Sequence, residues 1–534
     1  MYSRHLIEYL PDFLRSVREY KAILTDAFEP EIIELFQAIE NALNDQFIET
    51  ASEYGIARWE RMLGIVPKSG QPLEDRKFII KTKINEQSPY TLRALKQKIE
   101  ALCEDKNDYS VEVDVDKFIL KVRIALTSRD AFDAVCELVD FLRYNVAFAC
   151  KIYSSQPKSA YGQINSVEYR ALEGFILAVT PFNFTSIASN LNMAPAMMGN
   201  TTVWKASTTA ILSNYYIMKV FMEAGLPAGV VNFLCGQGSV IGGVALASPD
   251  LAGIHFTGSS ATFNHLWKQV GENLNRYKSY PRLVGETGGK DFIFVHPSAS
   301  VEAVANAAFC GAFEFQGQKC SAASRMYAPK SLWSGILEGI RKRAAEVTMG
   351  EVSDPQNFIN AVIDEASFDN CASYIEYAKG AEDAKIVVGG KYDKSTGYFV
   401  EPTVIETSNP HFKSMEEEIF GPILTVYVYD DENLDEAVKY CESTSPYGLT
   451  GSVFAQDRLA AEKITQALRY CAGNFYINDK PTGAVVGMQP FGGSRASGTN
   501  DKAGGEFNLI RWVTPRTIKE TLVSPTTYKY SYMD

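Results

Sequence analysis

The 534-residue sequence is poor in the features that mark metal-binding, secreted and membrane proteins. Its five histidines are scattered along the chain, so we predict no metal site. Its nine cysteines are odd in number and form no CxxC pair, which argues against a disulfide framework and favours a reducing compartment. No run of about 18 apolar residues occurs, so we predict no membrane-spanning helix and no membrane partner.

Positive charge is also scarce. The chain has 52 lysines and arginines against 64 acidic residues, a net charge of -12. This balance argues against nucleic acid or an anionic membrane as the main partner. The first residues include Arg4, Glu8 and Asp12 and lack an apolar signal segment. We expect a cytoplasmic protein in a bacterium, or a mitochondrial matrix protein in a eukaryote, although no transit peptide is recognisable.

The first 107 residues show mostly helical spacing of apolar residues, as in Ile39, Leu43 and Phe47. We predict helices at residues 53–63, 73–84 and 92–102. Residues 109–126 alternate apolar and polar side chains, which predicts a β-hairpin that turns near Asp116-Lys117. This segment has no catalytic spacing, so an assembly or packing role is the simplest interpretation.

From about residue 137 the pattern changes to short apolar strands that alternate with helices. This alternation is typical of a doubly wound parallel sheet, whose ligands bind at the carboxyl ends of the strands. The predicted strands are residues 175–179, 201–204, 230–234, 253–256 and 282–284.

Four domains are predicted: a module at 1–135, a nucleotide-binding domain at 136–308, a catalytic domain at 309–480 and a loop-and-tail region at 481–534. The glycine-rich stretch at 236–242 is one residue too long for a G-x-G-x-x-G motif, so we interpret it as a strand-to-helix turn. Thr257-Gly258-Ser259, before the next helix, is the better candidate for contact with a pyrophosphate.

One cysteine, Cys320, follows a Gly317-Gln318-Lys319 turn. An isolated cysteine is more often a small buried hydrophobe than a nucleophile. Backbone N–H groups and the adjacent lysine would lower its pKa from the usual value of roughly 8.5. We therefore expect an activated thiol if other residues support the chemistry.

A thiol that oxidises an aldehyde needs hydrogen-bond donors for the oxyanion, a base for water and a hydride acceptor. Asn183 follows a strand and could donate, although capping a turn is an equal alternative. Glu286 lies in a glycine turn and could activate water, or be a solvated acid. Glu418 could hold ribose hydroxyls or belong to a surface acidic run. Lys205 could contact the cofactor or be a solvated strand end.

Taken together and in this order, these stretches resemble the aldehyde dehydrogenase superfamily over residues 137–534. The similarity implies a doubly wound NAD-binding sheet plus an α/β catalytic domain, preceded here by a mainly helical α+β module. Within the superfamily the chain is most similar to the glutamate-γ-semialdehyde (Δ1-pyrroline-5-carboxylate) dehydrogenases, through residues 263–269, 473–480 and 489–501. The shared stretches are Pro181-Phe182-Asn183, Trp204-Lys205, Phe256-Thr257-Gly258-Ser259, Glu286-Thr287-Gly288-Gly289-Lys290, Gly317-Gln318-Lys319-Cys320 and Glu418-Ile419-Phe420-Gly421-Pro422.

This resemblance implies a role for each residue. Cys320 would attack the aldehyde, and Asn183 with the Cys320 backbone N–H would hold the oxyanion. Hydride would pass to NAD, the implied cofactor, and Glu286 would help water hydrolyse the thioester to glutamate. The residues implied to contact NAD are Lys205, Gly258, Ser259, Glu418 and Phe420.

The implied substrate is a small molecule with a carboxylate. Ser321 and the backbone of Gly483 and Ala484 would bind that carboxylate. Phe184 and Phe491 would sandwich the aliphatic part. The C-terminal tail and the strand near residues 159–171 are implied to form a homodimer.

Residues 1–135 resemble a different family, the tail baseplate proteins of phages and prophages. The resemblance lies in residues 9–12, 46–60 and 73–76. It implies an assembly role, tail-assembly contacts and an apparent chimera. Glu137, where the dehydrogenase similarity begins, falls at the position of an acid that lines the substrate tunnel.

Three functional hypotheses stay open at this point: an active dehydrogenase, a tail structural protein carrying a truncated dehydrogenase, and an inactive fusion. In dehydrogenases of this type, residues before the Glu137 position supply helices that cover the NAD-binding sheet. We therefore expect an uncovered apolar sheet face in this chain.

Overall fold

The computed structural model describes residues 129–533 continuously. Two compact units divide the chain, Met1–Leu126 and Thr127–Asp534. Helix α7 (Arg129–Ser154) runs across residue 135. The four predicted domain boundaries stay predictions. Before residue 129 the described residues are 5–9, 15, 17–30, 33–34, 37, 41, 44–45, 50–63, 65, 67, 71–74, 76–77, 80, 109–114 and 119–124.

The first unit holds helical segments and one hairpin. Helix α4 (Glu53–Leu63) occupies the residues predicted for it. Strands β1 (Tyr109–Asp114) and β2 (Ile119–Ile124) pair antiparallel, as predicted for a hairpin. The predicted turn at 116–117, the helix at 92–102 and most of the helix at 73–84 lie outside the described residues. The remaining described elements of this unit are η1 (Leu6–Tyr9), α2 (Arg18–Lys21) and the π-helix η2 (Ala22–Phe28).

The second unit begins with a five-stranded parallel sheet, which confirms the predicted doubly wound pattern. The strand order is β6-β5-β4-β7-β8, so the order reverses between β4 and β7. Crevices at such reversal points bind ligands at the carboxyl ends of the strands. The strands are β4 (Phe175–Val179), β5 (Thr201–Lys205), β6 (Val231–Leu234), β7 (Leu251–Thr257) and β8 (Arg282–Glu286).

Both faces of this sheet are covered at its centre. Ile176 packs with α7 and α8 (Thr185–Met197) and with Trp512. Leu177, the next residue, points to the opposite face and packs with α10 (Gly238–Ala247) and α11 (Ser260–Glu272), as strand alternation requires. The expectation of an uncovered sheet face is therefore wrong for the central strands.

Several exposed apolar side chains lie together on α9 (Ile211–Glu223). Phe221 packs inward against Trp204, while most of the helix faces solvent. Large apolar residues occupy that outer face: Leu212, Tyr215, Tyr216, Val220 and Met222, with exposed fractions of 69%, 48%, 58%, 53% and 59%.

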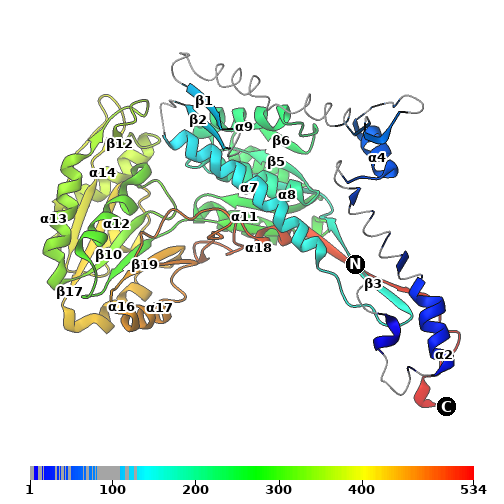
Figure 1. The fold of residues 1–534 in the computed structure, drawn as a ribbon. Helices are drawn as coiled ribbons and strands as arrows, with labels where there is room; N and C mark the ends of the chain where they lie inside the picture. Colours follow the sequence, from blue (N-terminus) through cyan, green and yellow to red (C-terminus); the bar gives the residue numbers. More distant parts are fainter. Residues whose placement is uncertain are drawn as a thin grey trace. The chain divides into compact units, whose positions relative to one another are not determined.

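A second, seven-stranded sheet, whose strands lie between residues 291 and 477, forms the core of the rest of this unit (Figure 1). Its order is β13-β16-β17-β10-β9-β19-β20, and only β13 runs antiparallel to its neighbour. The strands are β9 (Asp291–Val295), β10 (Ala323–Pro329), β13 (Ala384–Val388), β16 (Thr403–Thr407), β17 (Ile423–Tyr429), β19 (Thr450–Phe454) and β20 (Asn474–Ile477).

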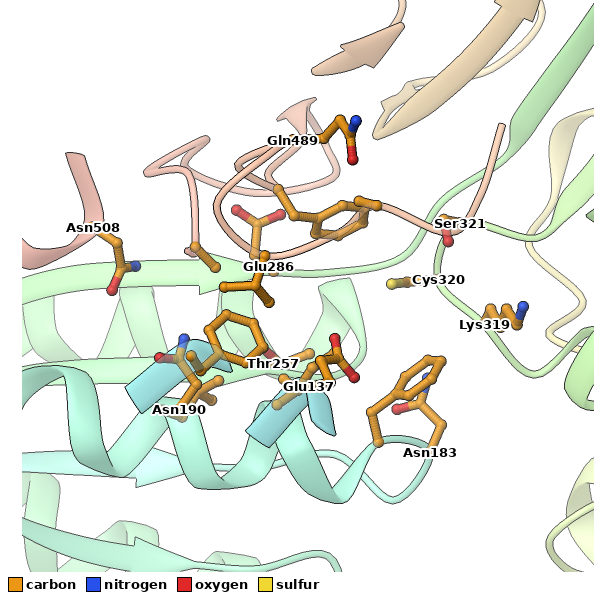
Figure 2. A pocket seen from close by; sticks show the side chains of 18 of the residues that line it. Glu137, Asn183, Asn190, Thr257, Glu286, Lys319, Cys320, Ser321, Gln489 and Asn508 are labelled. Carbon is orange, nitrogen blue, oxygen red and sulfur yellow. The ribbon is translucent and has the colours of Figure 1, made fainter. Parts of the chain in front are cut away.

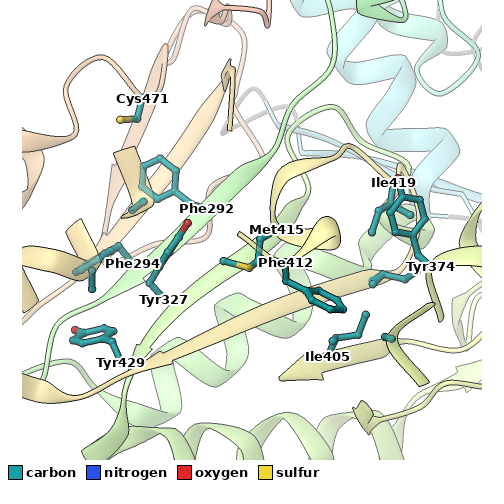
Figure 3. Packing of buried hydrophobic residues seen from close by; sticks show 14 of the residues in the cluster. Phe292, Phe294, Tyr327, Tyr374, Ile405, Phe412, Met415, Ile419, Tyr429 and Cys471 are labelled. Carbon is teal, nitrogen blue, oxygen red and sulfur yellow. The ribbon is translucent and has the colours of Figure 1, made fainter. Parts of the chain in front are cut away.

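Alternate residues of β9 divide between the two faces of this sheet. Phe292 and Phe294 pack with α14 (Glu365–Lys379), α16 (Leu434–Ser443) and α17 (Arg458–Ala467) in the cluster drawn in Figure 3. Ile293 and Val295 pack with α12 (Val301–Phe313) and α13 (Lys330–Glu346) on the other face. The result is a three-layer domain with two apolar cores.

A two-stranded arm joins distant parts of the chain. Strand β3 (Gln163–Ala171) pairs antiparallel with β22 (Val513–Thr521). Among the described residues, no helix is long and apolar enough to cross a membrane. The shorter elements are η3 (Thr208–Ala210), η4 (Leu274–Arg276), η5 (Glu314–Gly317), β11 (Thr348–Met349), β12 (Asn357–Ile359), β14 (Tyr392–Asp393), β15 (Phe399–Val400), α15 (Lys413–Glu416), η6 (Asp431–Asn433), β18 (Tyr447–Gly448), β21 (Ser494–Arg495), α18 (Glu506–Leu509), η7 (Ile510–Trp512) and η8 (Ser531–Met533).

Candidate active site

A cavity of about 690 Å³ lies where the two sheets meet, and the Cys320 side chain lines it. Figure 2 shows the sulfur pointing into this space, between Glu286 on one side and Glu137 and Asn183 on the other. The lining is mostly apolar with a few polar groups, as is typical of small-molecule sites. The predicted nucleophile, oxyanion donor and water-activating acid therefore share one cavity.

Cys320 sits on a tightly turned loop before β10. Phe315 and Gln316 have φ angles of 55° and 57°, so the chain reverses there. Gly317, at φ 63°, continues the turn, and a Cβ on it would lie 2.4 Å from the carbonyl oxygen of Gly421. Glycine is therefore required at this close approach.

The expectation of a thiol activated by a neighbouring lysine is wrong in this structure. Lys319 Nζ is 2.9 Å from Glu314 Oε2 and faces that carboxylate. No helix begins at Cys320, because a turn and then β10 follow it. Burial raises the pKa of the Cys320 thiol, and the nearby Asp291 and Glu286 carboxylates raise it further. A base must therefore take the thiol proton during attack.

Asn183 follows β4 at the carboxyl edge of the sheet. Its Nδ2 donates to the carbonyl oxygen of Gln318 at 3.1 Å, two residues before Cys320. This bond places the side-chain amide beside the loop that carries the thiol. The amide is thus close enough to the thiol to donate to an oxygen that develops there.

Glu286 ends β8 and its side chain is half-buried. Its Oε2 accepts a hydrogen bond from the backbone N–H of Gly493 at 2.9 Å. Burial raises its pKa well above the ordinary value, and the Gly493 bond and the Lys502 charge oppose this shift. A carboxyl group whose pKa is raised is a stronger base once ionised, which suits a general base.

Two glycines let Glu418 approach the turn after Glu286. The backbone N–H of Gly289 donates to Glu418 Oε1 at 2.9 Å. A Cβ on Gly288 would lie 2.2 Å from Glu418 Oε2. The Gly289 bond holds the Glu418 carboxylate in place. Burial raises the pKa of Glu418.

The predicted substrate-binding residues surround the same cavity. Ser321 Oγ is 2.8 Å from Thr482 Oγ1, and Gly483 next to it has a φ of 92°. Glu137, from α7, accepts a hydrogen bond from Ser186 Oγ at 2.6 Å, and burial raises its pKa. Phe184, Ala484 and Phe491 also line the cavity.

Three of the predicted NAD-binding residues, Lys205, Gly258 and Ser259, lie at the carboxyl edge of the five-stranded sheet. Ser259 caps α11, where its Oγ accepts from the Thr262 N–H at 3.3 Å. At Gly238, the first residue of α10, a Cβ would lie only 3.8 Å from Lys205 Nζ. Two helix N-termini and a lysine fit a dinucleotide with its pyrophosphate.

Phe420, at φ 59°, packs edge-on against Phe182 with ring centroids 5.8 Å apart. Gly258 donates its N–H to the Glu286 carbonyl oxygen at 3.2 Å, so the predicted cofactor and catalytic residues adjoin.

Sequence reasoning did not identify several other polar residues of the cavity. Thr482 is a neighbour of the predicted Gly483 and holds Ser321, so its position in the motif was a usable signal. The others come from separate elements and carry no local signature: Asn190, His255, Gln489 and Asn508.

Residues 119–518, about three quarters of the chain, match the aldehyde dehydrogenase family. The chain belongs to the aldehyde dehydrogenase family. The Δ1-pyrroline-5-carboxylate dehydrogenase of Dictyostelium discoideum, described as mitochondrial, is 54% identical over 404 residues, which cover 75% of this chain and 72% of that protein. The corresponding human protein is 48% identical over 402 residues, which cover 75% of this chain and 71% of that protein.

Solved aldehyde dehydrogenase structures agree. The Δ-pyrroline-5-carboxylate dehydrogenase of Mycobacterium tuberculosis, bound with NAD, is 52% identical with a TM-score of 0.72, and the match covers 75% of this chain and 74% of that one. The enzyme from Thermus with bound NAD is 33% identical with a TM-score of 0.67, covering 73% and 74%.

The N-terminal residues have a second similarity. Residues 4–157 match a family described as Bacteriophage Mu-like, Gp48. This match supports a resemblance of the first residues to a phage protein and the interpretation of the chain as a chimera. It overlaps the aldehyde dehydrogenase match at residues 119–157.

Proposed function

We propose that the chain is an NAD-dependent dehydrogenase that oxidises L-glutamate γ-semialdehyde, formed from Δ1-pyrroline-5-carboxylate, to L-glutamate in proline catabolism. The observation that carries this proposal is the shared cavity of Cys320, Asn183 and Glu286 beside a dinucleotide-binding edge. The named relatives, at 48–54% identity, favour an enzyme over a tail protein that carries an inactive dehydrogenase.

In the first step the Cys320 sulfur bonds to the aldehyde carbon. Its proton goes to a base, and Glu286 is the carboxylate of the cavity suited to take it. The aldehyde oxygen becomes an oxyanion, which the Asn183 amide and the Cys320 backbone N–H stabilise. Holding all three groups on separate rigid elements preorganises the attack.

NAD, when bound, supplies the acceptor for the hydride that leaves the substrate carbon and so makes the thioester possible. On the protein side, Lys205, Gly258 and Ser259 would hold the dinucleotide at the sheet edge. Glu418 and Phe420 would contact it from the catalytic domain.

Before the last step Glu286 releases the thiol proton to solvent. The ionised Glu286 then orients a water at the thioester carbon and accepts a proton from it. The carbon–sulfur bond breaks, and glutamate leaves Cys320. Throughout, Ser321 with Gly483 and Ala484 would bind the substrate's carboxylate. Phe184 and Phe491 would enclose its aliphatic part, and Glu137 would line the approach.

The test is formation of NADH from Δ1-pyrroline-5-carboxylate, followed by its absorbance. We expect Cys320→Ala to abolish turnover because no other side chain of the cavity can form the thioester. Cys310→Ala is the matched control: this half-buried cysteine lies on α12, outside the cavity lining, and its loss should leave turnover unchanged. A folded protein that binds NAD but gives no NADH would exclude the proposed activity.

Finer features of the assembly also belong to the proposal. Strand β22 of the β3–β22 arm is mostly exposed, which supports a homodimer formed through the C-terminal tail. The match of residues 4–157 to a phage family supports tail-assembly contacts of the N-terminal module. A matrix location in a eukaryote, or a cytoplasmic one in a bacterium, stays a prediction.

A further inference from the structure

A loop with strained backbone angles donates a hydrogen bond to Glu286. It runs from Phe491 to Ala503 and closes on itself, because these two residues exchange backbone hydrogen bonds of 2.9 and 2.7 Å. Within it, Gly493 donates to Glu286 Oε2. Non-glycine residues rarely adopt positive φ, yet Asn500 and Lys502 have φ angles of 56° and 55°.

Lys502 lies at the neck of this loop, and its ammonium group makes three hydrogen bonds. Nζ donates to the carbonyl oxygens of Gly473 and Gly492 at 2.7 and 3.0 Å, and to Asn474 Oδ1 at 3.3 Å. Asn474 begins β20 in the seven-stranded sheet, and Gly473 directly precedes it. The lysine therefore ties the residue next to Gly493 to a rigid strand.

The same neck lies against the Glu286 carboxylate. A Cβ on Gly492 would be 3.0 Å from Glu286 Oε1 and 3.1 Å from the Lys502 backbone nitrogen. Two charged groups act on Glu286 in opposite directions: Lys502 favours its ionised form, and Asp501 opposes it. Asp501 is itself paired with Arg511 at 3.3 Å, so the positive charge that acts on Glu286 is that of Lys502.

We propose that Lys502 is a positioning residue for thioester hydrolysis, since it clamps the Gly492–Gly493 segment that holds Glu286 and keeps that carboxylate ready to accept a proton. This inference rests on the proposed function for the identity of the step. Its physical basis is independent of the aldehyde, because any acyl group on Cys320 must be removed by the same water.

The step balances without a further reactant. The water oxygen bonds to the acyl carbon, and one of its protons moves to Glu286. The carbon–sulfur bond then breaks, and the electron pair returns to the Cys320 sulfur. The proton held by Glu286 passes to the sulfur, which restores the thiol, and the carboxylic acid leaves and gives its own proton to solvent.

The decisive experiment uses an activated ester, p-nitrophenyl acetate, which can acylate Cys320 without NAD. We expect Lys502→Met to keep the initial burst of nitrophenolate and to slow the steady rate by at least about tenfold, since general-base assistance is worth roughly 10²–10⁴-fold. We also expect the acid limb of the steady rate to move to higher pH, because the neutral side chain raises the pKa of Glu286.

Matched variants keep the result interpretable. Lys463→Met removes an exposed lysine paired with Asp435 and should change neither phase. Lys502→Arg keeps the charge, so its acid limb should stay close to that of the unmodified protein even if the three hydrogen bonds are lost. If burst and steady rate fall together in Lys502→Met with an unchanged pH profile, Lys502 has only a structural role and the inference is wrong.

The ester assay also separates this inference from the proposed function. A protein that shows the burst pattern with the ester but no oxidation of Δ1-pyrroline-5-carboxylate would contradict the substrate and support Lys502. If both Lys502 variants oxidise Δ1-pyrroline-5-carboxylate at the rate of the unmodified protein, the substrate is supported and the role of Lys502 is contradicted.

Discussion

At the residue scale, the Asn183 amide is the group with the clearest separate contribution to rate. Its Nδ2 is held 3.1 Å from the Gln318 carbonyl oxygen, beside the Cys320 loop. We expect Asn183→Ala to lower kcat by about 10²–10³-fold, the usual cost of one oxyanion donor. Asn183→Asp should be at least as slow, because a carboxylate presents negative charge where the oxyanion forms.

Steady-state kinetics with Δ1-pyrroline-5-carboxylate measure both variants, and binding of NAD shows that the fold is kept. Asn165, a half-buried asparagine on β3 outside the cavity lining, gives the matched control Asn165→Ala, which should leave kcat unchanged. Retention of more than about a tenth of kcat by Asn183→Ala would show that the Cys320 backbone N–H stabilises the oxyanion alone.

The sequence predicted that Cys320, Asn183 and Glu286 come together, and they line one cavity, whereas their electrostatics were not predictable. Cys320, Asn183 and Glu286 each follow a local turn or strand end, so their types and order sufficed. The direction of the Cys320 pKa shift depends on burial and on Asp291, which packs close to the loop only after folding. Lys502 escaped notice because its partners, Gly473 and Gly492, are 29 and 10 residues away.

At the element scale, the buried strand β9 contributes side chains to both apolar cores of the seven-stranded sheet. Phe294 is fully buried between Tyr327 and Tyr429, with ring centroids 6.0 and 5.8 Å away. We expect Phe294→Ala to lower the free energy of unfolding by about 3–5 kcal/mol, since it removes a large buried side chain and leaves a cavity. Denaturant unfolding of the pure protein measures this change.

Phe507 provides the control, because its side chain is 67% exposed on α18. Phe507→Ala should change stability by no more than about 0.5 kcal/mol. Equal effects of the two substitutions would mean that the cluster around Phe294 does not limit unfolding.

Strand β7 illustrates what sequence patterns miss about elements. The apolar pattern placed its start at Gly253, but the strand begins at Leu251. A Cβ on Gly253 would lie 3.0 Å from the Arg282 carbonyl oxygen and 3.1 Å from the Trp512 ring. Glycine in a strand often marks such a close approach rather than a strand end. Trp512 comes from the C-terminal region, so no local signal could have revealed it.

At the scale of the whole molecule, the outer face of α9 distinguishes this chain from a fully covered domain. The match covers 72% of the Dictyostelium relative, so more than a quarter of that protein has no counterpart in the matched residues. Leu212, Val220 and three other large apolar residues of α9 are each about half exposed or more. Contiguous apolar surface of this kind promotes association.

We therefore expect the protein to self-associate through α9 and to bind a hydrophobic dye. The double change Leu212→Lys and Val220→Glu should reduce both effects, because it places charges on the exposed face without touching the inward Phe221. Light scattering and dye fluorescence measure the change. Leu459→Lys is the control. Leu459 is 78% exposed on α17, which packs on the other, seven-stranded sheet. Equal scattering from the double variant and the control would show that the outer face of α9 does not mediate the association.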